Sequence, residues 1–315
     1  MSISEKLTQL NGIKQDIKQA IIDKGQAATD DMTEYSTLIS NISDDSLKNM
    51  IERNGNDINL PSDLTKIGNY AFYYNSSLNL TSLPDGVTSI GSNAFQDCTN
   101  LALTSLPSGI TSISFSAFYG CTNLALISLP SGITSIDSSA FYGCTNLALT
   151  SLPSGITSIS SSAFYGCTNL ALTSLPSGIT SIGSNTFYGC TNLALTSLPS
   201  GITSIGSSAF SNCTNLALTS LPSGITKISD YAFNKCTNLA LTSLPDSLTN
   251  IGSNAFSNCS SLTTLTFKST PTTISSTAFK NCGLLTINVP WSEGAVANAP
   301  WGATNATINY DYVGG

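Results

Sequence analysis

Apolar residues recur along most of this chain with a fixed period of 23 residues. The repeated unit reads CTNLALTSLPSGITSIxSxAFYG. Its ten phenylalanines are Phe72, Phe95, Phe118, Phe141, Phe164, Phe187, Phe210, Phe233, Phe256 and Phe279. A period of about 20–50 residues is the signature of a solenoid, because one unit cannot bury its apolar side chains without stacking on its neighbours. The pattern therefore predicts ten stacked coils over residues 54–282, with side chains of one phase aligned in columns.

Each unit is expected to contain three elements. Residues 101–106 predict a short strand, which Pro107 ends without interrupting its interior. Serine and glycine at 108–109 are typical of a turn, and residues 110–113 predict a second extended stretch. Residues 116–120 suit a single helical turn, with alanine and phenylalanine pointing inward. The predicted class is therefore an α/β solenoid.

The residue before each cysteine is also informative. These residues are Asp97, Gly120, Gly143, Gly166, Gly189, Asn212, Lys235, Asn258 and Asn281. Glycine, asparagine and aspartate tolerate the left-handed backbone conformation better than other residues. We expect a positive φ at this phase of every coil.

The two ends of the chain do not follow the period. In residues 1–53, apolar residues at helical spacing are Ile3, Leu7, Leu10, Ile13, Ile17 and Ile21. They predict a small α-helical N-terminal module, which either covers the first coil or serves attachment and oligomerisation. In residues 283–315, Trp291, Trp301 and an expected final strand over 307–312 predict a C-terminal cap.

The repeat resembles a known family. Residues 202–216 read ITSIGSSAFSNCTNL, which is similar to BspA-like leucine-rich repeats, and the resemblance covers about 225 of the 315 residues. It implies a leucine-rich-repeat solenoid and a role in adhesion. Family repeats usually read LxxIxIP where this chain has LALTSLP, so Leu103 falls at an outward position and Thr104 at an inward one. Either the strand is bulged and the leucine column is buried, which we favour, or the concave face carries a row of leucines.

Charge is scarce and unevenly placed. Charged residues make up 9% of the chain, the formal net charge is −7, and there is no histidine. Between Cys98 and Thr226 the single charged residue is Asp137. Without a basic face, the chain is not expected to bind nucleic acid or an anionic membrane. No apolar run is long enough for membrane insertion, and the opening MSISEKLTQL lacks the features of a signal peptide.

The repeats lack the residues that most catalytic and metal sites use. General acid–base catalysis usually relies on histidine or paired carboxylates, so we expect no catalytic residues, no cofactor and no enzymatic activity. The nine cysteines each stand alone at one phase, without the clustered spacing of a metal site, and no metal is expected. We interpret them as buried free thiols. The expected core columns include Phe118, Phe141, Phe164, Cys121, Cys144 and Cys167.

Two polar columns are candidates for binding. A tyrosine stripe, preceded by Tyr73 and Tyr74, consists of Tyr119, Tyr142, Tyr165 and Tyr188. Its rings either flank the turn, partly buried, or form an aromatic strip for sugar rings or a partner protein. An asparagine column consists of Asn100, Asn123, Asn146, Asn169, Asn192, Asn215 and Asn238. It is expected to form a hydrogen-bonded ladder, beside neutral serine and threonine rows that suit glycans.

The flanks carry a second resemblance. Residues 17–25 and 289–312 look like the flanks of repeat proteins encoded by tailed bacteriophages of gut bacteria. This resemblance implies a tail or fibre component of the virion, assembled in the host cytoplasm and attached to other virion tail proteins by its N-terminal module. We predict a non-enzymatic homo-oligomer, with a trimer as one arrangement, that binds a bacterial surface glycan or protein. The alternatives are a surface or secreted bacterial adhesin, a structural fibre without a receptor, and a crystal-binding face.

Overall fold

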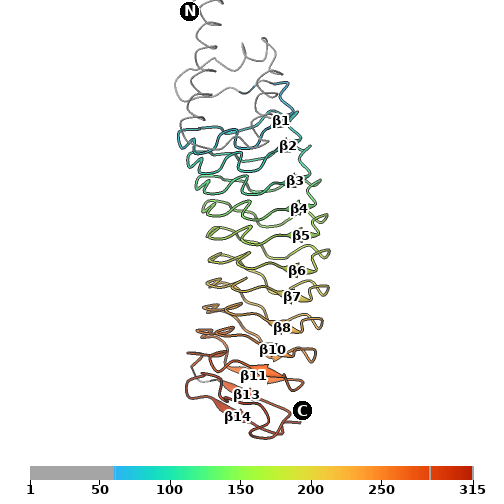
Figure 1. Ribbon diagram of the computed structural model, residues 1–315, viewed down its shortest axis with the longest axis vertical. Coiled ribbons are helices and arrows are strands. Elements are labelled where there is room, and N and C mark those ends of the chain that lie inside the picture. The colour runs from blue at the N-terminus through green and yellow to red at the C-terminus, as the bar shows by residue number, and fades with distance from the viewer. Residues whose placement is uncertain (1–59, 61, 284, 314–315) are drawn as a thin grey trace, which may run out of the picture. The chain divides into compact units, whose positions relative to one another are not determined.

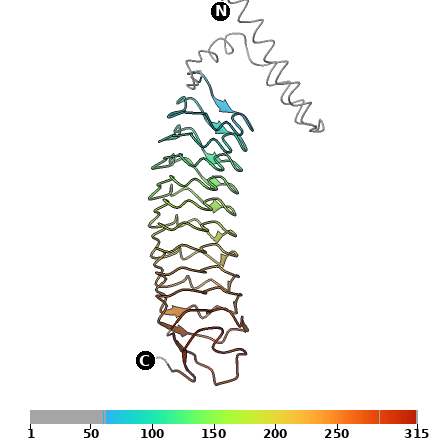
Figure 2. The ribbon, with the colours of Figure 1, turned by 90° about the vertical axis from the view of Figure 1, so that its left-hand side faces the viewer.

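A computed structural model describes residues 60, 62–283 and 285–313 (Figure 1, Figure 2). These residues wind into a stack of coils, which confirms the predicted leucine-rich-repeat solenoid. An eleventh coil follows the ten marked by phenylalanines. The N–H of Phe279 donates to the Trp301 carbonyl (2.9 Å), a bond that earlier phenylalanines also make to the next coil. The predicted helical module over residues 1–53 lies outside the described residues.

Ten two-residue strands occur at the same place in successive coils and pair in parallel. They are β1 (Lys66–Ile67), β2 (Ser89–Ile90), β3 (Ser112–Ile113), β4 (Ser135–Ile136), β5 (Ser158–Ile159), β6 (Ser181–Ile182), β7 (Ser204–Ile205), β8 (Lys227–Ile228), β10 (Asn250–Ile251) and β12 (Thr273–Ile274). Ser112 pairs with Ser135 and Ile113 with Ile136, a shift of one period. The sheet orders are β1-β2, β3-β4-β5 and β12-β10-β8-β7-β6. These strands confirm the second extended stretch, with each isoleucine buried.

The helical turn predicted at residues 116–120 is wrong, and the described fold is a β-solenoid rather than an α/β one. The described part of the chain contains no helix. Ser116 and Gly120 have left-handed φ values of 49° and 69°, which interrupt any helical run. The N–H of Gly120 instead donates to the Tyr142 carbonyl in the next coil (2.7 Å). We call residues 114–121 and their equivalents the turn edge.

The left-handed backbone predicted before each cysteine is confirmed. All nine of these residues have φ between 57° and 70°. A second left-handed column, four residues earlier, is not predicted by the sequence pattern: Tyr70, Asn93, Ser116, Ser139, Ser162, Asn185, Ser208, Tyr231 and Asn254. Serine and tyrosine adopt this conformation at a cost. Backbone hydrogen bonds between coils offset that cost at every turn edge.

Gly143→Ala is expected to lower the free energy of unfolding by about 1–2 kcal/mol, the cost of a left-handed non-glycine residue. The added Cβ would lie 3.8 Å from the Gly120 Cα, which is ordinary contact, so backbone strain alone carries the effect. Gly143→Asn is expected to cost less, because Asn212 occupies this phase naturally with φ 61°. Urea unfolding measures both variants, and equal losses would contradict the strain explanation.

The leucine column that the family pattern places outward is buried, as favoured. Its members are at most 2% exposed: Leu103, Leu126, Leu149, Leu172, Leu195, Leu218 and Leu241. Thr104 is exposed instead, followed by a second exposed residue, Ser105. Two adjacent outward residues break the alternation that a strand requires. The strand predicted over 101–106 is therefore not formed, and a bond from the Ala125 N–H to the Leu103 carbonyl (3.1 Å) joins the coils there.

Strands at this position appear in the C-terminal coils. They are β9 (Ser243–Leu244), β11 (Thr264–Phe267), β13 (Thr286–Asn288) and β14 (Thr307–Asn309), in the order β14-β13-β11-β9. Leu262, Leu265 and Phe267 follow the LxxIxI spacing, and β11 alternates exposed and buried residues. The shift of the buried residue by one position thus accompanies the four-residue strand β11, whereas β9 lies in a coil that keeps the LALTSLP spacing and pairs with β11.

Two columns fill the centre of the stack. Neighbouring phenylalanine rings from Phe72 to Phe279 lie 5.2–5.6 Å apart between centroids, with planes 2–11° apart. The nine cysteines are free and buried. Each thiol donates to the carbonyl of the phenylalanine 26 residues earlier, at 2.9–3.1 Å. The thiols are therefore small buried groups whose donors are satisfied.

Tryptophans close the C-terminal end of this core. Trp301 is fully buried, and its ring meets Phe279 edge to face at 6.4 Å. Its Nε1 donates to the Ala297 carbonyl (2.8 Å). Trp291 packs against Phe267 at 5.2 Å. The last coil thus covers the final phenylalanine of the stack.

Candidate functional site

Three outward columns run along the segments that precede each proline. In one coil, Asn100 and Thr104 are exposed and Ala102 is half-buried, while the leucines between them are buried. The columns contain Asn100, Asn123, Asn146, Asn169, Asn192, Asn215 and Asn238; Ala102, Ala125, Ala148, Ala171, Ala194, Ala217 and Ala240; and Thr104, Ile127, Thr150, Thr173, Thr196, Thr219 and Thr242. We call them the amide–methyl–hydroxyl face. Each coil contributes one residue to each column.

This face carries no charged side chain. Asp137, the single charged residue between Cys98 and Thr226, lies on the turn edge. Among the described residues, no three His, Cys, Asp or Glu side chains come together where they could hold a metal ion. Across the same residues, no helix combines the length and apolarity needed to cross a membrane. Hydrogen bonding and apolar contact are therefore the interactions that this face offers.

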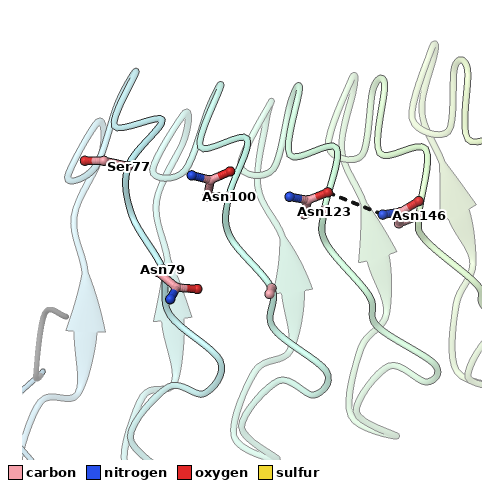
Figure 3. Close-up of a pocket in the computed structure, with 6 residues that line it drawn as sticks. Ser77, Asn79, Asn100, Asn123 and Asn146 are labelled. Carbon is pink, nitrogen blue, oxygen red and sulfur yellow. Dashed lines mark hydrogen bonds between the residues drawn. The ribbon is translucent and has the colours of Figure 1, made fainter. Parts of the chain in front are cut away.

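An open groove of about 390 Å³ lies at the N-terminal end of this face (Figure 3). It is lined by Ser77, Asn79, Asn100, Ala102, Asn123 and Asn146. The Nδ2 of Asn146 donates to the Oδ1 of Asn123 at 3.4 Å. An asparagine amide has two N–H donors and an oxygen with two lone pairs. One bond between neighbours therefore leaves both amides able to bind a ligand.

The predicted asparagine ladder is present between Asn123 and Asn146, and a longer ladder runs one residue earlier in each coil. There, each threonine hydroxyl donates to the carbonyl of the threonine one period before, at 3.3–3.4 Å. The donors are Thr122, Thr145, Thr168, Thr191, Thr214 and Thr237. Because these hydroxyls donate their hydrogen bonds to the preceding coil, the exposed asparagines are better placed to contact a ligand.

The predicted tyrosine stripe stacks ring on ring. Tyr119, Tyr142, Tyr165 and Tyr188 are half-buried, with neighbouring centroids 4.4–4.5 Å apart and planes 4–8° apart. Burial and the adjacent tyrosines raise the pKa of Tyr165. Because Tyr142 and Tyr165 have a ring against each face, no sugar ring can stack on either of them. Binding by this stripe stays a prediction, and at its two central tyrosines only edges and hydroxyls are available for it.

Tyr165→Ser is expected to lower the free energy of unfolding by about 1–3 kcal/mol, because each of its two aromatic contacts contributes about 0.5–1.5 kcal/mol. The coil is expected to fold, since Ser211 occupies the same phase one coil beyond Tyr188. Urea unfolding followed by circular dichroism gives the stability. A loss below about 0.5 kcal/mol, typical of a neutral surface substitution, would contradict a packing role.

The tyrosines that precede the stripe are arranged differently. Tyr70, Tyr73 and Tyr74 are 46%, 43% and 61% exposed. The rings of Tyr73 and Tyr74 are perpendicular, with centroids 4.4 Å apart. Burial, followed by a hydrogen bond with Tyr74, raises the pKa of Tyr73. These rings leave more surface open to a partner than the stacked tyrosines do.

The cysteines are poorly suited to chemistry. Burial raises the pKa of all nine thiols, to about 12 for Cys98 and about 11 for Cys282, whose coils lie nearest the ends of the column. The thiolate is the form that attacks electrophiles and binds metal ions. At neutral pH these side chains are therefore protonated and inert.

Sequence reasoning missed two exposed apolar side chains and the groove itself. Phe115 is 50% exposed on the turn edge, and Ile127 is 69% exposed in the hydroxyl column. Both break the consensus, since neighbouring coils have serine and threonine at these phases. That departure is the signal that could have identified them. The groove has a weaker signal of the same kind, because Asn79 stands where the following coils have alanine, while Ala102 in its floor follows the consensus.

Comparison with known proteins gives the family and several similar structures. A family described as BspA type leucine rich repeat region matches residues 40–171 and 157–286. A leucine rich cell surface protein from Faecalibacterium prausnitzii A2-165 is 27% identical, with 83% of this chain and 89% of that chain covered and a TM-score of 0.49. A leucine-rich repeat protein from Bacteroides ovatus ATCC 8483 is 21% identical, with 79% of this chain and 88% of that chain covered and a TM-score of 0.41. The pneumococcal vaccine antigen PcpA is 19% identical, with 81% of this chain and 78% of that chain covered and a TM-score of 0.49. No curated protein matches the chain.

Proposed function

This chain belongs to the BspA-type leucine-rich repeat family, and on that premise we propose that it is a non-enzymatic, adhesin-type binding protein of a bacterial cell surface. Its coils would present one repeated surface to a glycan or protein on another cell. Adhesion is the role that the family resemblance implies. The repeats contain no histidine and, over residues 98–226, one carboxylate, so they lack the side chains that usually act as general acid and base.

The observation that carries this proposal is the uncharged, periodic amide–methyl–hydroxyl face. Seven coils in succession present the same outward asparagine and alanine, and six of them the same threonine. A single contact of this kind is weak, because it exchanges hydrogen bonds with water for hydrogen bonds with a partner. Many such contacts in a row add up, as in other multivalent binding. The face thus suits attachment to a repetitive surface.

Adhesion is expected to be insensitive to salt. Beads coated with the protein are incubated with panels of bacterial and epithelial cells, and retained beads are counted against albumin-coated beads. Because the face has no charges to screen, retention is expected to stay constant between about 0.05 and 0.5 M NaCl. Retention no greater than that of albumin beads on every cell type would refute the adhesin function. Loss of retention at high salt would show that charge, rather than this face, carries binding.

A tail or fibre component of a bacteriophage is the second candidate. It is favoured by the resemblance of residues 17–25 and 289–312 to the flanks of phage-encoded repeat proteins. Residues 17–25 lie outside the described residues, whereas 289–312 lie in the last coil. Mass spectrometry of purified virions, together with electron microscopy, distinguishes the two. Finding the chain in tailed particles would favour this candidate, and finding it only in bacterial envelopes would eliminate it.

A further inference from the structure

We propose that the amide–methyl–hydroxyl face binds a neutral, linear polysaccharide laid along the coil stack, with successive sugar units meeting successive coils. This inference rests on the proposed adhesin function and names the ligand of that function. It places the ligand on this face rather than on the tyrosine stripe, where neighbouring rings cover the faces of Tyr142 and Tyr165.

The amide column supplies paired donors and acceptors. Asn123 and Asn146 share one bond of 3.4 Å and are exposed, so each retains N–H and lone-pair capacity on the groove side (Figure 3). A sugar hydroxyl is both a donor and an acceptor, and two adjacent hydroxyls can engage one amide. In addition, Thr104 and its equivalents present exposed hydroxyls two residues beyond the alanine. Six of the seven coils therefore offer polar groups on both sides of a narrow strip, and the coil of Ile127 offers them on the asparagine side alone.

The methyl column supplies the apolar floor between these polar groups. Ala102 lines the groove, and Ala125 continues the floor into the next coil. A pyranose ring has apolar C–H groups on its faces, which can pack on methyl groups while its hydroxyls reach the two polar columns. Ile127 adds an exposed apolar side chain at one point of the hydroxyl column. The order polar–apolar–polar across the strip matches the cross-section of a sugar ring lying on its face.

Charge and spacing narrow the ligand class. The face has no cation to pair with a carboxylate, sulfate or phosphate, so an anionic polysaccharide would lose water without gaining an ion pair. The contacts repeat once per coil, and the ring centroids of equivalent tyrosines and phenylalanines in neighbouring coils lie 4.4–5.6 Å apart. A linear polymer of identical sugar units is the ligand that can use such a repeat, since one favourable contact recurs at every coil. A folded protein without repeats of its own does not present such a period, and contact with a second copy of this chain is distinguished by the sedimentation measurement below.

The test uses cells that retain beads coated with the protein, and compares retention before and after the cells are chemically treated. Periodate cleaves the vicinal diols of glycans, whereas protease removes surface proteins. We expect periodate to abolish retention and protease to leave it unchanged. The opposite pattern would overturn the polysaccharide inference while leaving the adhesin function intact. Failure to be retained by any untreated cell would instead refute the adhesin function itself.

A charge-matched pair of variants tests the face. The first carries Asn100→Asp, Asn123→Asp and Asn146→Asp. The second places three carboxylates on the turn edge, through Ser138→Asp, Ser161→Asp and Ser184→Asp, a phase where Asp230 stands naturally. Retention of the first is expected to fall by about tenfold or more, because multivalent binding amplifies each lost contact. The second is expected to behave as the unmodified protein. Equal retention of the two variants would overturn the inference.

An uncharged variant guards against a folding artefact. Ala125→Gln together with Ala148→Gln fills the floor of the strip without adding charge. It is expected to lose retention as the asparagine variant does, with an unchanged circular dichroism spectrum. Normal retention by this variant would overturn the inference. A change in sedimentation coefficient without loss of retention would assign the face to contact between copies of the chain, which also overturns it.

Discussion

Raising the pH from about 8 to about 11 is expected to unfold the coil stack, because the buried thiols ionise in the unfolded chain first. An unfolded cysteine titrates near pH ~8.5. Burial raises the pKa of all nine folded thiols, to about 11 for Cys282 and about 12 for Cys98. The contribution of these thiols to the free energy of unfolding is fully present below about pH 8.5 and is lost as the pH rises toward their pKa values in the folded protein.

The size of this effect comes from repetition. Between its unfolded and folded pKa values, each thiol lowers the free energy of unfolding by about 1.4 kcal/mol per pH unit. Nine thiols together lower it by roughly 12 kcal/mol per pH unit, whereas the free energy of unfolding of a typical protein is about 5–15 kcal/mol. Circular dichroism against pH, with a reducing agent present, follows the transition. A variant with Cys144→Ala, Cys167→Ala and Cys190→Ala is expected to show a pH dependence shallower by about one third. An unchanged slope in that variant would rule out the thiols as the cause.

Phe164→Ala is expected to lower the free energy of unfolding by about 3–5 kcal/mol, the usual cost of removing a buried phenylalanine ring. Phe164 is fully buried and stacks on Phe141 at 5.5 Å and Phe187 at 5.6 Å. The cavity would weaken two coil junctions at once. Since a solenoid is stabilised by its repeats and by their nearest-neighbour interfaces, the two halves are expected to unfold at different urea concentrations.

Phe115→Ser is the matched control for this substitution. It also removes a phenylalanine, but one that is 50% exposed, at a phase where Ser138 and Ser161 stand in the following coils. A change within about 0.5 kcal/mol is expected, as for other surface substitutions. Comparable losses from the two variants would mean that the phenylalanine column does not hold the coils together.

The register of the stack could be predicted because it depends on spacing alone. Leucine, phenylalanine and cysteine return every 23 residues, and a one-period shift is the pairing that places each kind of residue on its own kind. The turn edge could not be predicted in the same way. Ser116 and Gly120 adopt left-handed φ so that their N–H groups reach the next coil. Local propensity, which favours a helical turn there, gives no information about bonds to another coil.

In the candidate site, too, residue spacing predicts some features and not others. Which asparagines, alanines and threonines share a column follows from the repeat, and burial of Leu103 could be favoured but not settled. The stacking of Tyr142 on Tyr165 depends on ring orientation, which spacing does not specify. The groove depends on small differences between coils, such as Asn79 where later coils have alanine. Neither the ring stacking nor the groove follows from the spacing of residues along the chain.

Every junction between the central coils repeats the same register, as when Ser112 meets Ser135 and Ser135 meets Ser158. Removal or duplication of 23 residues would therefore rejoin the chain with the same partners on both sides of the change. Unequal recombination between near-identical gene segments can produce such changes in one step. The reach of the molecule can thus vary among lineages in increments of one coil, while the chemistry of its surface stays constant.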